Sequence, residues 1–216
     1  MKSYDVILFD LDGTLTDSSP GIINSIIYAL KKYDIAVENT ETLGKFLGPP
    51  LHESFRDLYG FEEDKAMEAV SFYREYFSTK GLLENKVYDG IPQLLQELVD
   101  NGKRLILATS KPQQFTDRIM EHFDLAKYFE FTAGSNMDGT RSKKADVIEY
   151  ALRQCSIADK SKAVMVGDRM HDIIGAKAVG MDSIGVEYGY GDYEELNNAG
   201  ALYIAKTVAD LKNILL

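Results

Sequence analysis

The sequence has little of several residue types, and each shortage excludes a class of protein. Cys155 is its only cysteine, so a disulfide within the chain and a zinc site built from thiolates are both excluded. Lysine and arginine number 24 against 34 aspartates and glutamates, which gives a formal net charge of -10. Nucleic acid polymers and anionic membranes bind concentrated positive charge, so neither is expected as a partner.

Long apolar runs are also missing, and no stretch approaches the length of a membrane-spanning helix. The N-terminus has too short an apolar run for a signal peptide, so we expect a cytoplasmic protein. The nucleotide-binding pattern G-x-x-x-x-G-K-[ST] and the esterase pattern G-x-S-x-G do not occur. With 216 residues, 45% of them hydrophobic, the chain can form one large domain or one domain with an insertion.

The most informative stretch that is present is V-I-L-F-D-L-D-G-T-L-T, residues 6–16. Its four apolar residues, Val6 to Phe9, are too few for a helix and predict a central parallel strand covered on both faces. Asp10 and Asp12 follow this strand, and Gly13 then allows a tight turn. Two neighbouring carboxylates repel each other, which either raises one pKa or requires a cation. A solvated turn is the alternative at this point.

The spacing of apolar residues divides the rest of the chain. Helical spacing dominates residues 17–84, and strands return only from Val87, after which strand and helix alternate. This order predicts an α/β fold: a doubly wound, Rossmann-like parallel sheet from residues 1–16 and 85–216, with a small all-helical cap inserted over 17–84. Because the cap follows the acidic loop directly, we expect it to act as a lid.

Within this plan, Ser142 is expected to cap a helix that runs to about Gln154. Pro112 is expected to open another helix, since proline suits the first helical position. Further helices are expected over 51–59, 66–77, 91–100, 170–179 and 207–216, and strands over 104–108, 129–133, 163–166, 183–187 and 202–205.

Polar residues also follow the later predicted strands. Thr109 and Ser110 follow the strand 104–108, and Asp168 follows 163–166, with Asp172 one helical turn further on. Ligands of open α/β sheets bind outside the carboxyl ends of the strands, so these residues are site candidates. A capped helix start at Thr109 and a solvated first turn at Asp172 are the simpler interpretations.

Lys144 has an unusual position in the helical pattern. It shares a face with the apolar residues Ile148 and Leu152, so it should point inward, whereas Lys143 should point toward solvent. A lysine on a buried face needs a negative partner. The acidic strand ends would supply it.

The order of these motifs resembles the haloacid dehalogenase-like hydrolase superfamily, specifically its phosphatases with a helical cap. The resemblance rests on D-L-D-G-T at 10–14, the strand ending in Thr-Ser, Lys144, and G-D-x-x-x-D at 167–172. Within the superfamily the chain is similar to phosphoglycolate phosphatases and their 5'-nucleotidase relatives, which share Gly-Pro-Pro-Leu (48–51) and Gly-x-x-Tyr-Gly (185–189). Many phosphoglycolate phosphatases have Lys-Pro where this chain has Lys-Ala.

The resemblance implies a role for each motif residue. Asp10 would be the nucleophile that forms an aspartyl phosphate, and Asp12 the general acid and then base. Asp10, the main-chain carbonyl of Asp12 and Asp168 would hold Mg²⁺, with Asp172 holding a metal-bound water or Lys144. The expected contacts to substrate are made by Gly13 and Thr14 in the first loop, by Thr109, the Ser110 amide and Lys144 on the phosphate, and by Lys45, Arg56 and Arg74 in the cap.

The implied function is a Mg²⁺-dependent phosphatase of small phosphorylated metabolites, such as phosphoglycolate-like acids or nucleoside 5'-monophosphates. The protein would be a monomer or homodimer. An inorganic pyrophosphatase or a phosphosugar mutase would use the same chemistry. A receiver-type signalling module, which also carries a phosphorylated aspartate, is less favoured because receivers lack a large helical insertion after the first strand.

Overall fold

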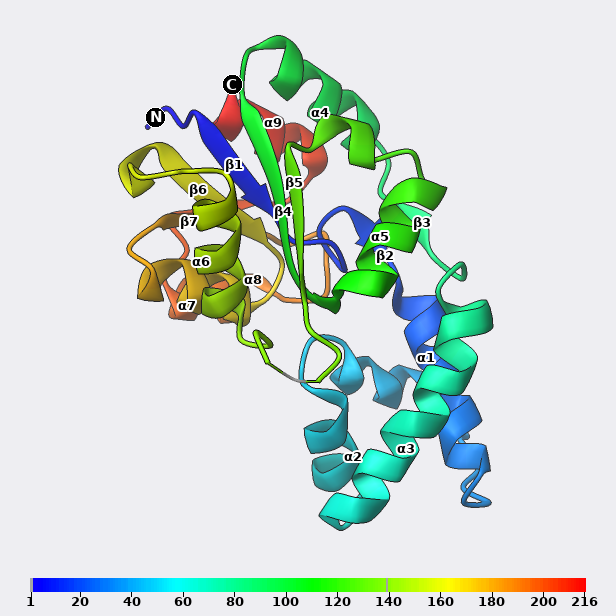
Figure 1. Ribbon diagram of the computed structural model, residues 1–216. Helices are drawn as coiled ribbons and strands as arrows, with labels where there is room; N and C mark the ends of the chain where they lie inside the picture. The colour runs from blue at the N-terminus through cyan, green and yellow to red at the C-terminus, as the bar shows by residue number, and fades with distance from the viewer. Residues whose placement is uncertain (1, 139) are drawn as a thin grey trace. The chain divides into compact units, whose positions relative to one another are not determined.

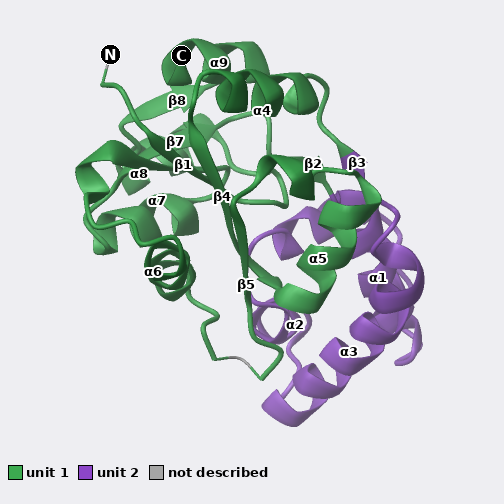
Figure 2. Cartoon of the chain, turned by 45° about the horizontal axis from the view of Figure 1, so that its top comes forward, with its two compact units in different colours: residues 1–17, 87–216 green, residues 18–86 purple. Residues whose placement is uncertain are grey.

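The computed structural model (Figure 1) describes residues 2–138 and 140–216 of the chain. These residues form two compact units, which Figure 2 colours separately. Unit 1 comprises residues 1–17 and 87–216, and unit 2 comprises residues 18–86. Unit 2 therefore interrupts unit 1 in the sequence shortly after the first strand.

A parallel sheet of six strands organises the described part of unit 1 (Figure 1). Its spatial order is β5-β4-β1-β6-β7-β8, and every neighbouring pair is parallel. Numbered along the chain, the strands of this sheet lie in the order 3-2-1-4-5-6 of a doubly wound fold, so the predicted fold class is confirmed. The strands are β1 (Val6–Phe9), β4 (Arg104–Pro112), β5 (Phe131–Ser135), β6 (Ala163–Gly167), β7 (Asp182–Val186) and β8 (Tyr203–Ala205).

Helices cover both faces of this sheet (Figure 1). Side chains alternate between the faces of β1, so Val6 and Leu8 join the core beneath α6 and α7, while Ile7 and Phe9 point to the opposite face. All four are buried, which is why the strand lacks polar residues. The helices of unit 1 are α4 (Ile91–Asp100), α5 (Gln113–His122), α6 (Lys144–Gln154), α7 (Met170–Ala178), α8 (Tyr193–Ala199) and α9 (Val208–Leu215), with short 3₁₀ turns η3 (Ala126–Tyr128) and η4 (Lys160–Lys162).

Unit 2 is helical. Its packing depends on close backbone contact: a Cβ on Gly21 would lie 1.9 Å from the carbonyl oxygen of Gly81, so neither position has room for a side chain facing the other. The chain enters and leaves the unit beside two short strands, β2 (Thr16–Asp17) and β3 (Lys86–Val87). The elements of unit 2 are α1 (Ser19–Lys31), the 3₁₀ helix η1 (Thr40–Phe46), α2 (Leu51–Tyr59), α3 (Glu63–Tyr76) and the π-helix η2 (Phe77–Gly81).

Two local expectations were wrong, and one helix was missed. The strand expected to end at Ala108 continues to Pro112, which precedes α5 instead of opening it. Ser142 is not a cap, because α6 begins at Lys144 and no side chain caps it. The helix α8 was not expected, although the side chain of Asp192 accepts a hydrogen bond from the Glu195 N–H in its first turn. This Asp-x-x-Glu pattern was the available signal.

No helix in the described ranges combines the length and the apolar composition that crossing a membrane would need.

Candidate active site

The strand order of the sheet reverses at β1, which lies between β4 and β6. Doubly wound sheets bind ligands at this point, outside the carboxyl ends of the strands. Asp10 follows β1 directly and Asp168 follows β6 directly. The Asp10 N–H donates to the Val166 carbonyl at 2.9 Å, which ties the end of β1 to β6.

The structure brings together Asp10, Asp168 and Asp172, although they are far apart in sequence. Their carboxylates each offer an oxygen atom within 4.8 Å of the others. Asp10 is 8% exposed, Asp168 0% and Asp172 1%. Asp172 is therefore not a solvated first turn, and its carboxylate belongs to this buried cluster.

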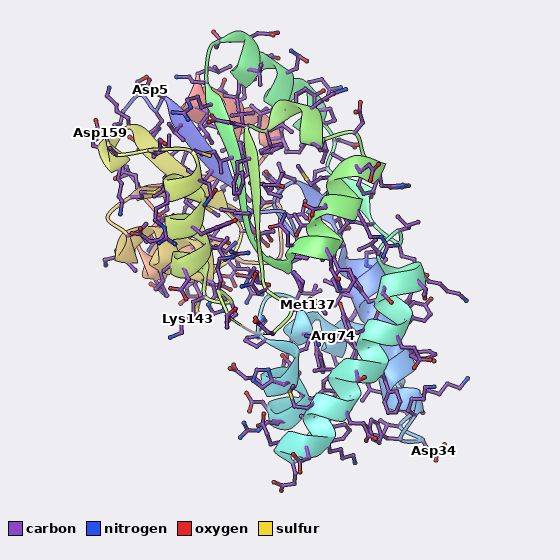
Figure 3. All side chains as sticks on the ribbon, in the orientation of Figure 1. Asp5, Asp34, Arg74, Met137, Lys143 and Asp159 are labelled. Atoms are coloured by element: carbon purple, nitrogen blue, oxygen red, sulfur yellow. The ribbon has the colours of Figure 1, made fainter. Side chains whose placement is uncertain are left out.

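Lys144 supplies positive charge to the cluster. Its Nζ lies 2.7 Å from Asp10 Oδ1 and 2.7 Å from Asp172 Oδ1, and it donates to the Ala108 carbonyl at 3.1 Å. Its neighbour Lys143, labelled in Figure 3, lies at the start of α6 with an exposed side chain. The helical pattern therefore predicted the direction of both lysines correctly.

Burial dominates the electrostatics of the cluster. It raises the pKa of Asp10 to about 6: Asp172 and Asp12 add to this effect, and Lys144 opposes it. Burial also raises the pKa of Asp168 well above its ordinary value, and Asp172 and Asp10 add to the effect. For Lys144, burial alone would lower the pKa, but Asp10 and Asp172 outweigh it and raise the pKa. The positive charge of Lys144 is therefore not enough to balance the three buried carboxylates of the cluster.

This donor set fits a hard divalent cation. Carboxylate oxygens are the ligands that Mg²⁺ and Ca²⁺ prefer, and a cation among them would relieve the repulsion that raises the pKa values. Asp12 Oδ1 is also buried without a hydrogen-bond partner among the described residues, but the Asp12 carboxylate is not one of the three that gather within 4.8 Å. Asp10, Asp168 and Asp172 are therefore the residues that could hold a metal ion.

The first loop packs directly on Asp168. Thr14 Oγ1 donates to Asp168 Oδ1 at 3.4 Å, and the Tyr190 N–H donates to Asp168 Oδ2 at 2.8 Å. Gly13 has a φ of +80°, and a Cβ there would lie 2.0 Å from Asp168 Oδ2. Position 13 therefore requires glycine both for its backbone conformation and for space.

A second segment, residues 188–191, supports this loop. The Tyr188 hydroxyl donates to the Thr14 carbonyl at 3.1 Å. A Cβ on Gly189 would lie 2.2 Å from the Gly13 carbonyl oxygen, and one on Gly191 would lie 2.1 Å from that of Asp168. Sequence reasoning noted the Gly-x-x-Tyr-Gly pattern here but assigned it no role.

Asp12 has a partner that sequence reasoning missed. Lys111 Nζ lies 2.7 Å from Asp12 Oδ2, and the two side chains are 6% and 22% exposed, respectively. Lys111 stands in the stretch Thr-Ser-Lys-Pro, which resembles a capped helix start. The stretch has no periodic pattern that would predict which of its side chains point inward. Only the fold indicates that this lysine is buried.

An irregularity in β4 explains the position of Lys111. The register of β4 with β5 shifts between Ala108 and Pro112, as at a β-bulge. Thr109 is buried and its Oγ1 accepts a hydrogen bond from the Lys111 N–H at 3.2 Å, while Ser110 is exposed. Bulges occur next to active sites because they redirect side chains and release main-chain groups.

The expected cap residues lie in unit 2, and their part in the site stays a prediction. Lys45 is exposed, Arg56 Nη1 pairs with Glu63 Oε2 at 2.8 Å, and Arg74 on α3 is half-buried (Figure 3). His171, beside Asp172 in the first turn of α7, is exposed and takes no part in the carboxylate cluster.

The fold and the site define a doubly wound α/β protein with a buried carboxylate and lysine cluster at the point where the strand order reverses. Comparison with protein families gives a match of residues 7–186 to the haloacid dehalogenase-like hydrolases. The chain belongs to this family.

Its relatives include proteins with different names. It is 39% identical over 216 residues to the tyrosine-protein kinase PtkA of Mycobacterium tuberculosis, covering 99% of this chain and 73% of that one. It is 44% identical over 212 residues to a 5'-nucleotidase of Pseudomonas aeruginosa, covering 98% and 96%. A solved structure of a predicted phosphatase from Clostridium acetobutylicum has a TM-score of 0.93 at 52% identity and covers 98% of each chain. The hydrolase family, the relative named 5'-nucleotidase and the solved structure of a predicted phosphatase together identify the chain as a phosphatase.

Proposed function

We propose that this phosphatase is Mg²⁺-dependent and hydrolyses small phosphate monoesters through an aspartyl phosphate on Asp10. The observation that carries the proposal is the environment of the Asp10 carboxylate. It stands at the end of β1, pairs with the buried Lys144, and is crowded by Asp168 and Asp172. A carboxylate held in this way is fixed in direction and only partly neutralised, as a nucleophile requires.

Asp10, the Asp12 main-chain carbonyl, Asp168 and Asp172 would hold the Mg²⁺ ion, with Asp172 also bound to Lys144. When bound, the ion supplies positive charge that reduces the repulsion between the nucleophile and an anionic phosphate.

The chain's own residues would then carry two steps. Asp10 attacks phosphorus, the bond to the leaving oxygen breaks, and that oxygen takes a proton from Asp12. Asp12, now a carboxylate, takes a proton from a water molecule that attacks the phosphoryl group and releases inorganic phosphate from Asp10. Thr109, the Ser110 N–H and Lys144 hold the phosphoryl oxygens during both steps.

The different roles proposed for Asp10 and Asp12 agree with the different burial of their side chains. The side chain of Asp12 is 22% exposed, against 11% for that of Asp10, which makes Asp12 the better placed of the two to reach a leaving group. Asp10 is more buried and follows β1 directly, which suits the attacking group.

Nucleoside 5'-monophosphates are the first substrates to test, because a relative that matches nearly the whole chain is named a 5'-nucleotidase. Phosphoglycolate-like acids come second, and pyrophosphate and phosphosugars are further members of the panel. The partner would be a small phosphorylated metabolite, with Gly13 and Thr14 beside its phosphate and Lys45, Arg56 and Arg74 available to its anionic groups. A cytoplasmic monomer or homodimer stays part of the proposal.

The test is phosphate release from this panel and from p-nitrophenyl phosphate, with and without MgCl₂. Asp10→Asn should lower the rate by about 1000-fold or more, because asparagine cannot form the acyl phosphate. Asp5→Asn is the matched control, since Asp5 precedes the same strand and is exposed. Unchanged turnover in Asp10→Asn would overturn the proposal. A long-lived phosphoaspartate without turnover, after treatment with acetyl phosphate, would favour the receiver alternative instead.

A further inference from the structure

Lys111 is a buried lysine that the two proposed steps do not use. Lysine side chains are rarely buried unless they are paired with an anion. Here the anion is the carboxylate of Asp12, whose Oδ2 lies 2.7 Å from Lys111 Nζ. The ion pair therefore joins the bulged end of β4 to the residue assigned to proton transfer.

The main chain of Lys111 is held on several sides. Its N–H donates to Thr109 Oγ1 at 3.2 Å, and its carbonyl accepts from Thr116 Oγ1 at 3.3 Å. A Cβ on Gly134 of β5 would lie 2.8 Å from the same carbonyl oxygen, so the neighbouring strand approaches closely. The ammonium group therefore extends from a rigid base.

Asp12 is less constrained without this lysine. It lies in the turn after β1, and its side chain is more exposed than those of Asp10, Asp168 and Asp172. In the described part of the chain, its second oxygen, Oδ1, accepts no hydrogen bond. Oδ1 is also buried, so the contact of Lys111 with Oδ2 is the one charged contact that sets the direction of this carboxyl group among the described residues. Proton transfer to a leaving group requires such a fixed direction.

We propose that Lys111 is a positioning residue that fixes the Asp12 carboxyl group for proton transfer. This inference rests on the proposed function. Lys111 keeps its own protons throughout: the proton that reaches the leaving oxygen comes from Asp12, and the bond that breaks joins that oxygen to phosphorus.

The role can be tested by the basicity of the leaving group. Nitrophenolate leaves without protonation, whereas an alkoxide needs a proton from Asp12. In the first turnover, Lys111→Met should slow release of the alcohol from a nucleoside 5'-monophosphate by about 100-fold and release of nitrophenolate by less than about 5-fold, with the substrate concentration for half-maximal first-turnover rate nearly unchanged. Lys111→Arg should restore part of the loss.

A matched control and a double-mutant cycle complete the experiment. Lys160→Met removes a surface ion pair of the same length, in which Lys160 Nζ lies 2.7 Å from Glu149 Oε1. It should leave the rates of leaving-group release from both esters unchanged. On an Asp12→Asn background, Lys111→Met should cause no further loss, because its effect passes through Asp12.

The outcomes separate the two proposals. If the wild-type protein is active and Lys111→Met slows the first-turnover release of both leaving groups equally, or adds its full loss to Asp12→Asn, the positioning role is wrong while the proposed function stands. If the wild-type protein hydrolyses none of the esters with MgCl₂ present, the proposed function fails and the positioning role fails with it.

Discussion

Replacing Gly13 by alanine tests whether the contact between the first loop and Asp168 controls both stability and activity. Gly13 has a φ of +80° and Gly102 has a φ of +73°, so alanine meets nearly the same backbone strain at either position. The surroundings differ. A Cβ at Gly102 would have nothing within 4 Å, whereas one at Gly13 would lie 2.0 Å from Asp168 Oδ2 and 2.5 Å from its Cγ.

The expected size of the effect follows from this difference. A left-handed alanine costs about 1–2 kcal/mol in the free energy of unfolding at both positions. Gly13→Ala adds about 1–3 kcal/mol for overpacking, since Asp168 is fully buried and its Oδ2 is already bound by the Tyr190 N–H. If Asp168 moves to make room, the site loses its geometry, and a shift of about 1 Å costs on the order of 100-fold in rate.

The assay compares the two variants with the wild type by urea denaturation and by phosphate release from p-nitrophenyl phosphate. We expect Gly13→Ala to lose about 2–5 kcal/mol and most activity, and Gly102→Ala to lose about 1–2 kcal/mol and no activity. Equal losses of stability with full activity in both variants would refute the reasoning, because they would show that the close approach to Asp168 has no consequence.

Two further predictions concern charge in the cluster. Burial raises the pKa of Asp10 to about 6, so its protonated form favours folding below about pH 4 and this stability is lost as the pH rises through about 6. MgCl₂ at about 100 times its dissociation constant should therefore raise the melting temperature by roughly 5–10 °C at about pH 7.5, and by less near pH 5. Equal shifts of the melting temperature at both pH values would contradict this prediction, and so would an Asp168→Asn variant with the same shift as the wild type. Lys144→Met should lower the free energy of unfolding by about 3–5 kcal/mol at neutral pH, because it leaves buried carboxylates unpaired, and part should return at acid pH. Lys143→Met, on the exposed side of the same helix start, should cost little, and similar losses in the two variants would count against the buried ion pairs.

Several features of the site could be predicted because they depend on local periodicity. Four consecutive apolar residues before Asp10 could only be covered on both faces, which placed that aspartate at the end of a central strand. The helical period placed Lys144 on the buried face of α6 and Lys143 on the exposed face. The expectation of a helix cap at Ser142 was wrong, because a polar residue shortly before a helix need not be its cap.

Other features depend on contacts between segments far apart in the sequence. The irregularity in β4 is a shift of its register with β5 between Ala108 and Pro112, and nothing within Thr-Ser-Lys-Pro indicates this. The support of Asp168 by residues 188–191 likewise requires the turn after β7 to lie against the first loop.

The sequence by itself determined the order of the six sheet strands and of the helices between them other than α8, the acidic residues at the strand ends, and the inward direction of Lys144, because each follows from the period of a strand or helix. Only the tertiary structure decided that Lys111 is buried against Asp12 and which of the carboxylates contact Lys144. The reason is physical: the sheet brings the ends of β1, β4 and β6 together, and burial then forces each ionised group to find a partner there. Asp10 and Asp172 pair with Lys144, and Asp12 pairs with Lys111.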